Sequence, residues 1–256
     1  MGKWIFVLGL VLSFNVYAQT SGSCAANGAG NTCAWSYDAL TNTLTISGEG
    51  EMKNYNYSPS DATSGAPWFL YKDEIKNIVI ENGITNIGKA AFLGTKVEKI
   101  DIPNSVTSIG TYAFFKTKEL KNIELPNNLQ TINHAAFYQS GLISIDIPDS
   151  VQIISSSAFA TQSLRELTIS DSVDFINTFE CSAFNDGSKS FPSKLHIVCK
   201  GAKQICEEKI RENMDKPNHP QIETIFNVYR ANRRIYTIDE AVQDSGKVNT
   251  IRIKYK

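Results

Sequence analysis

One dipeptide, Ala-Phe, returns five times at almost equal intervals, and it restricts the fold of this chain more than any other feature. The pairs are Ala91-Phe92, Ala113-Phe114, Ala136-Phe137, Ala158-Phe159 and Ala183-Phe184. From one phenylalanine to the next, the steps are 22, 23, 22 and 25 residues. A unit of about 20 to 29 residues that carries a short strand predicts a solenoid, in which stacked coils bury a shared core.

Each pair closes a longer frame that repeats with it. Two apolar residues separated by one other residue come first: Ile78/Ile80, Ile100/Ile102, Ile123/Leu125, Ile145/Ile147 and Leu167/Ile169. A turn with one apolar residue follows, and then a single isoleucine: Ile87, Ile109, Ile132, Ile154 and Ile176. The whole frame recurs, so the repeat is a property of the fold and not of one dipeptide.

The coil that begins at Ile100 shows how the frame works. Ile100 and Ile102 alternate with Asp101, which predicts a short strand with both isoleucines inward and Asp101 at the surface. Pro103 ends the strand because proline donates no ladder hydrogen bond. The phenylalanines would then stack inside as a ladder, with neighbouring strands about 4.8 Å apart. We interpret this aromatic stripe as core packing and not as a cofactor site.

The frame of residues 100–114, Ile-Asp-Ile-Pro-Asn-Ser-Val-Thr-Ser-Ile-Gly-Thr-Tyr-Ala-Phe, resembles the BspA-type leucine-rich repeat family of bacterial and protist surface and secreted proteins. The segments Trp35-Ser-Tyr-Asp, Thr43-Leu-Thr-Ile-Ser-Gly and Pro67-Trp68 resemble the same family. The resemblance covers residues 22–200 and implies a β-rich solenoid of leucine-rich repeats. Its coils would have about 22–23 residues each. Family repeats often carry a cysteine three residues after the phenylalanine, where this chain has Thr95, Thr117, Ser140 and Gln162.

Residues 1–18 have the pattern of a secretory signal peptide. Lys3 supplies the charge, Trp4 to Val16 is mostly apolar, and a small-residue cleavage site ends at Ala18. The apolar run is short and interrupted by polar residues, so a membrane-spanning helix is not expected. We therefore expect a secreted or cell-surface protein, cleaved near Ala18, with no transmembrane segment in the mature chain.

After the signal peptide the sequence predicts four parts. Residues 19–77 form an N-terminal cap segment, with a β-hairpin of strands at 35–37 and 43–47 that covers the open end of the solenoid. Residues 78–200 hold the leucine-rich repeat solenoid, five coils plus a terminal strand. Residues 201–226 predict a helix, at 202–216, and a linker.

The last part, residues 227–256, predicts a small basic strand-helix-strand module. It has strands at 234–238 and 250–255, and Thr237 with Glu240 forms a capping box for a short helix between them. Seven Arg or Lys residues stand against three Asp or Glu. Either the module packs on the end of the solenoid, or it is a sorting or surface-retention tail.

Charge and cysteine usage exclude some classes of protein. The chain has 25 basic and 26 acidic residues, so nothing points to nucleic acid. Among the five cysteines, Cys24 and Cys33 flank a Gly/Asn-rich loop, and a disulfide there would staple the cap. The pairing of Cys181, Cys199 and Cys206 stays open. A zinc site is not favoured, because the chain has no Cys-x-x-Cys spacing and its histidines are dispersed.

No group of residues predicts catalysis. His134, His196 and His219 lie far apart in the sequence, and neither a Gly-rich phosphate loop nor a His-Glu-x-x-His pattern is present. We therefore expect a protein that is not an enzyme and has no cofactor.

The centres of successive strands suggest a ligand-binding face instead. This candidate face consists of Asp101, Glu124, Asp146, Thr168 and His196. Three of these are carboxylates about 5 Å apart from coil to coil, and like charges that face each other across strands are unfavourable. They would bind a basic patch on a partner or a calcium ion, or they form a solvated face relieved by neighbours such as Lys99.

A second candidate is an aromatic patch near the N-terminal cap, formed by Tyr55, Tyr57, Trp68 and Tyr71. Exposed, these rings would form a protein hot spot or a platform on which sugars stack. Buried, they pack the cap.

Three functions follow from these alternatives. The resemblance implies protein–protein interaction or adhesion, with extracellular matrix or host cell-surface proteins as partners and fibronectin and fibrinogen as typical ligands. The aromatic patch favours a carbohydrate-binding surface protein. The third function is a structural cell-envelope component without a discrete ligand. Neither ligand identity nor oligomeric state follows from the sequence.

Overall fold

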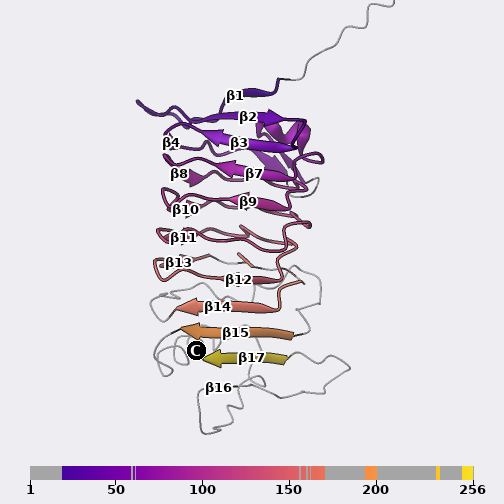
Figure 1. Cartoon of the computed structure of the whole chain (residues 1–256), viewed down its shortest axis with the longest axis vertical. Coiled ribbons are helices and arrows are strands. Elements are labelled where there is room, and N and C mark those ends of the chain that lie inside the picture. The colour runs from indigo at the N-terminus through magenta and orange to yellow at the C-terminus, as the bar shows by residue number, and fades with distance from the viewer. Residues whose placement is uncertain are drawn as a thin grey trace, which may run out of the picture.

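The computed structural model describes residues 19–170, apart from 59, 61, 156, 160 and 162, and also the backbone of three later strands. These strands are β15 (Lys194–Lys200), β16 (Ile235–Tyr236) and β17 (Thr250–Tyr255). The chain forms a tall stack of coils, with β1 (Ser21–Ser23) near one end and β16 and β17 at the other (Figure 1). The structure is thus β-rich, as the repeat predicts.

The first side of the stack is built from the strands that open each repeat. In chain order these are β7 (Asn77–Ile80), β9 (Lys99–Asp101), β12 (Ser144–Asp146) and β14 (Glu166–Ser170), followed by β15 and β17. Neighbours pair in parallel and in a constant frame, for example Ile78 with Ile100 and Ile145 with Leu167. Parallel pairing follows because every repeat runs in the same direction around the stack.

The second side is a ladder of very short strands. It consists of β4 (Gly50–Glu51), β8 (Ile84–Ile87), β10 (Ser108–Ile109), β11 (Thr131–Ile132) and β13 (Ile153–Ile154). The single isoleucines of four repeats, Ile87, Ile109, Ile132 and Ile154, lie here and are fully or almost fully buried, and Ile109 pairs with both Ile87 and Ile132. Ile176 lies outside the described residues.

The third side consists of the Ala-Phe turns, whose described residues form no strand. Every second amide donates to the carbonyl of the next coil: Tyr112 to His134, Phe114 to Ala136 and Lys116 to Tyr138. The amides between them bond within the turn, as Phe115 does to Tyr112. Backbone hydrogen bonds therefore hold this side together as a ladder would.

The core is a column of stacked aromatic rings. Phe92, Phe114, Phe137 and Phe159 are fully buried, and adjacent ring centroids lie 5.1–5.5 Å apart. Trp68 extends the column by one ring, 6.0 Å from Phe92, and its indole N–H donates to the carbonyl of Ala91. The predicted ladder is confirmed for these four phenylalanines, and Phe184 lies outside the described residues.

The N-terminal end carries the predicted hairpin. Strand β2 (Ala34–Asp38) pairs antiparallel with β3 (Thr43–Ser47), and β3 pairs in parallel with β7. Cys24 and Cys33 form a disulfide next to it, which confirms that prediction.

Residues 52–72 then cross over to the third side. They contain the small hairpin of β5 (Tyr57–Ser58) and β6 (Thr63–Ser64) and the 3₁₀ helix η1 (Pro67–Tyr71). Among the described residues, no helix has the length and apolar character needed to cross a membrane.

Two strands differ from expectation. Residues 121–126, which contain Ile123 and Leu125, form no strand, so the first-side ladder is interrupted between β9 and β12. Ile123 is nevertheless buried, and the Ile143 amide donates to the carbonyl of Lys121, so the segment keeps its place in the stack. Strand β17 continues the ladder in parallel with β15, although its sequence departs from the repeat. The helices expected at 202–216 and within 237–244 lie outside the described residues.

Candidate functional site

The three carboxylates of the candidate ligand-binding face are exposed. Asp101 ends β9, Asp146 ends β12, and Glu124 lies in the segment between them. Each follows a buried isoleucine, Ile100, Ile123 and Ile145 respectively. The alternation of inward and outward residues thus puts one carboxylate per coil on the same side of the stack.

A lysine partly balances this charge. Lys99 Nζ lies 3.4 Å from Asp101 Oδ1, and both side chains are more than half exposed. An exposed pair of this kind contributes only about 0–1 kcal/mol, because water and salt screen it. The carboxylates therefore remain at the surface, where a partner can contact them.

The C-terminal end of the candidate face is different from what the sequence predicts. Thr168 pairs with Asp146 as expected, but only 8 % of its surface is exposed. The residue beside Thr168 in β15 is Val198, whereas His196 pairs with Glu166 and lies two positions away. A strand that shifts by two residues keeps the same residues on each face. The apolar alternation of β15 therefore fits His196 beside Thr168 as well as Val198 beside Thr168.

The four rings of the candidate aromatic patch do not form an exposed platform. Trp68 is fully buried because it takes the place of the core phenylalanine in the coil that precedes Phe92. Tyr55 is buried against it, with ring centroids 5.3 Å apart. Burial raises the pKa of Tyr55 far above its usual range, so its phenol stays protonated.

The other two tyrosines lie apart from each other and are only partly exposed. Tyr71 stacks on Tyr37 at 4.4 Å, and its hydroxyl donates to the carbonyl of Gln19. Tyr57 instead contacts Tyr112, at 4.7 Å, on the third side of the stack. The patch is thus divided between cap packing and a different surface.

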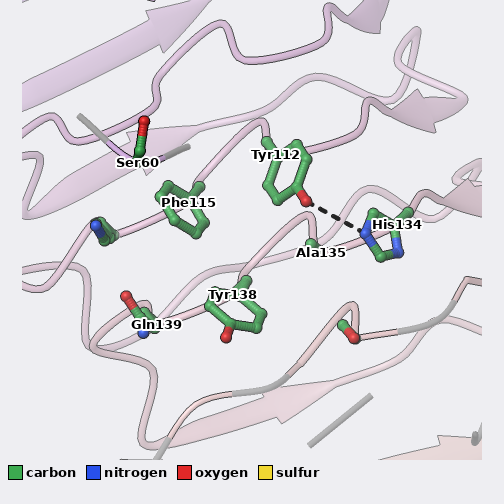
Figure 2. A pocket seen from close by; sticks show the side chains of 9 residues that line it. Ser60, Tyr112, Phe115, His134, Ala135, Tyr138 and Gln139 are labelled. Carbon is green, nitrogen blue, oxygen red and sulfur yellow. Dashed lines mark hydrogen bonds between the residues drawn. The ribbon is translucent and has the colours of Figure 1, made fainter. Parts of the chain in front are cut away.

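That surface contains a hollow of about 520 Å³, which sequence reasoning missed. Figure 2 shows its walls, which come from three successive Ala-Phe turns and from the 52–72 crossover. The lining residues are Ser60, Tyr112, Phe115, Lys116, His134, Ala135, Tyr138, Gln139 and Ser157. We call this the turn-face hollow.

Aromatic rings hold the hollow in shape. Phe115 is buried and stacks on Tyr138 at 5.4 Å, while Tyr112 meets Phe115 edge-on at 5.3 Å. The Tyr112 hydroxyl points toward His134 and lies 3.4 Å from its Nε2 (Figure 2). Burial, followed by the neighbouring Tyr57, raises the pKa of Tyr112, so the phenol is neutral near pH 7.

Two cationic side chains lie against these rings. Lys116 Nζ is 5.0 Å from the ring centroid of Phe115, and Lys89 Nζ is 4.6 Å from that of Tyr57. Cation–π contacts of this kind hold an ammonium group close to an aromatic wall.

The sequence contains a signal for this hollow. Directly after three of the four core phenylalanines stands a second large residue, Leu93, Phe115 or Tyr138, and these three belong to a smaller apolar cluster outside the core. Leu93 is covered by the 52–72 crossover, whereas Tyr138 stays partly exposed. Which of these residues are open depends on where the crossover ends, and the repeat alone does not determine this.

In the described part of the chain, no three His, Cys, Asp or Glu residues are grouped so that they could hold a metal ion. In particular, Asp101, Glu124 and Asp146 do not come together as a calcium cage.

Comparison with known proteins agrees with the geometry. A family model of the BspA type leucine rich repeat region matches residues 64–195 with six copies, just over half of the 256 residues. The chain belongs to the BspA-type leucine-rich repeat family. Proteins of this family are typically secreted or on the cell surface, usually without enzymatic activity, and leucine-rich repeats in general mediate protein–protein interaction. No curated protein matches the chain.

Solved bacterial leucine-rich repeat proteins are similar to this BspA-type chain. One from Eubacterium ventriosum is 25% identical over 53% of this chain and 41% of its own length, with a TM-score of 0.39. One from Bacteroides ovatus is 23% identical and covers 66% and 48%, with a TM-score of 0.44. The T. pallidum protein is 16% identical and covers 70% and 92%, with a TM-score of 0.46. This chain spans less than half the length of the first two proteins.

Proposed function

We propose that this protein is an exported solenoid that mediates adhesion by binding extracellular matrix or host cell-surface proteins through its first side. The observation that carries the proposal is the acidic column of Asp101, Glu124 and Asp146, which are all exposed on one side of consecutive coils. The binding partner would present a basic patch, because complementary charge attracts the partner and fixes its register. The sequence pattern of residues 1–18 supports export.

A rigid repeated scaffold suits this role. The carboxylates emerge beside buried isoleucines, so their backbone is fixed before a partner arrives. Binding then orders only the side chains, and this lowers the entropic cost of association. Short antiparallel strands at the two edges, β1 on β2 at the N-terminal end and β16 on β17 at the other, would keep the stack from pairing with further coils.

The test is capture of the purified chain on immobilised fibronectin and fibrinogen. We expect saturable capture, and the triple variant Asp101→Lys/Glu124→Lys/Asp146→Lys should weaken it at least about tenfold. Raising the salt concentration should weaken capture of the original chain as well, since exposed charges are screened over about 8 Å at physiological salt.

The matched control is Glu49→Lys/Glu81→Lys/Glu119→Lys, which makes the same change in net charge at three exposed residues outside the column. If both triple variants lost capture to the same extent, a binding site on the acidic column would be refuted. Absence of capture on every matrix protein would favour a structural envelope role instead.

A further inference from the structure

The turn-face hollow has the chemistry of a sugar-binding site. Its wall carries the rings of Tyr112, Phe115 and Tyr138, and polar side chains, Gln139 and Ser157 among them, also line it. Its volume falls within the range of about 300–1,000 Å³ that is usual for small-ligand sites. The hollow is on the Ala-Phe side of the stack and so is separate from the acidic column.

The backbone beneath the hollow is rigid before any ligand arrives. Tyr112 and Lys116 donate their amides to His134 and Tyr138 of the next coil, at 3.1 and 2.9 Å. Phe137 continues the pattern by donating to Ala158. The lining side chains therefore project from hydrogen-bonded turns, which reduces the entropy lost on binding.

The mixture of rings and polar groups favours a pyranose over an apolar peptide side chain. A pyranose presents C–H faces, which pack on aromatic rings, and a rim of hydroxyls, which replace the water on amide and hydroxyl groups. A leucine or phenylalanine side chain would strip water from the partly exposed Gln139 without offering hydrogen bonds, and that is costly.

The charges identify the kind of pyranose. Lys116 is part of the wall, Lys89 lies nearby over Tyr57, and none of the nine lining residues carries a carboxylate. A ligand carboxylate would thus meet an ammonium group and no like charge among these residues. We propose that the turn-face hollow binds a carboxylated pyranose, a uronic or sialic acid unit of a glycan.

Binding of oligogalacturonate, a hyaluronan oligosaccharide and sialyllactose to the full chain tests the assignment, with maltohexaose as the neutral sugar. At least one carboxylated glycan should bind more tightly than maltohexaose. Tyr138→Ala should weaken that binding by up to about tenfold through loss of the stacking ring. Lys116→Gln should weaken it about two- to fivefold and reduce its dependence on salt.

Lys118→Gln is the matched control, since Lys118 is exposed and does not line the hollow, and it should bind as the original chain does. If Tyr138→Ala fails to fold, Tyr138→Leu keeps the apolar volume and removes the ring. Three outcomes would overturn the proposal. Maltohexaose could bind as tightly as the carboxylated glycans, or polyglutamate could compete with them at the same concentration. The Lys116 variant could also bind them as tightly as the original chain does. Since the triple variant of the acidic column leaves the hollow intact, failure of either proposal leaves the other testable.

Discussion

At the scale of single residues, the position three residues after each core phenylalanine shows how the chain replaces the cysteine of its family. Thr95 Oγ1 donates to the carbonyl of Phe92, and Thr117 Oγ1 donates to that of Phe114, both at 2.8 Å. Both threonines are buried. Ser140 takes the same position, but its buried Oγ has no hydrogen-bond partner among the described residues. One frame position thus has a satisfied hydroxyl in two coils and an unsatisfied one in the third.

This difference predicts that loss of the hydroxyl affects stability at one of these positions and not at the other. Thr117→Val keeps the shape and removes the donor, so we expect a loss of about 1 kcal/mol in the free energy of unfolding. Ser140→Ala removes a hydroxyl that forms no bond, and the expected change is within about 0.5 kcal/mol of zero. Urea unfolding of the two variants measures both values. Equal losses would show that the threonine bond does not stabilise the turn.

At the scale of elements, the Ala-Phe turn depends on residues in the left-handed region. The turns of Phe92, Phe114 and Phe137 have two of them each, for example Tyr112 and Lys116 in one coil and Ala135 and Gln139 in the next, with φ of 52–59°. The first coil has glycine at the second of these positions, Gly94, which adopts φ 69°. Side chains with a Cβ are strained in this region, and glycine is not.

Gln139→Gly should therefore stabilise the protein, by up to about 1 kcal/mol, because it removes the Cβ conflict at positive φ. Gln130→Gly is the matched control, as Gln130 is exposed and is not in the left-handed region. It should destabilise by about 0.5–1 kcal/mol, the usual entropic effect of glycine. Thermal unfolding of the two variants measures both changes in stability. If both variants were less stable than the original chain, left-handed strain at Gln139 would be contradicted.

At the scale of the whole molecule, each coil contacts mainly its neighbours, so stability is expected to vary along the stack. The Cys24–Cys33 disulfide lies at the N-terminal end, beside the β2–β3 hairpin. It closes a short loop, and loops of this length contribute roughly 2–3 kcal/mol.

Cys24→Ala/Cys33→Ala should increase amide exchange in β1–β3 and leave residues 131–159 protected, because the loss is local to the capped end. Hydrogen exchange followed by mass spectrometry measures the two regions separately. Gly28→Ala lies in the same loop, where an added methyl meets no atom within 4 Å, and it should change neither region. A uniform loss of protection along the stack would mean that it unfolds as one cooperative unit.

The predictive power of the sequence differs between core and surface. Spacing alone identified the buried column of Phe92 to Phe159 and the exposure of Asp101, Glu124 and Asp146, and it offered Cys24–Cys33 as one pairing that the structure then showed. It left Trp68 open between an exposed ring and cap packing, since nothing in a tryptophan after proline distinguishes a surface ring from the first ring of the core. It also misplaced His196, because a shift by two residues preserves the pattern of a strand.

The sequence by itself determined the coil, its length and its inward-facing residues, because these follow from a periodic pattern that only stacked neighbours can bury. Only the tertiary structure decided which surfaces are open. The 52–72 crossover covers Leu93 but leaves Tyr138 partly exposed, and the turn-face hollow lies where this cover ends. The outcome depends on contacts between segments distant in the sequence, and a local pattern carries no information about where such segments end.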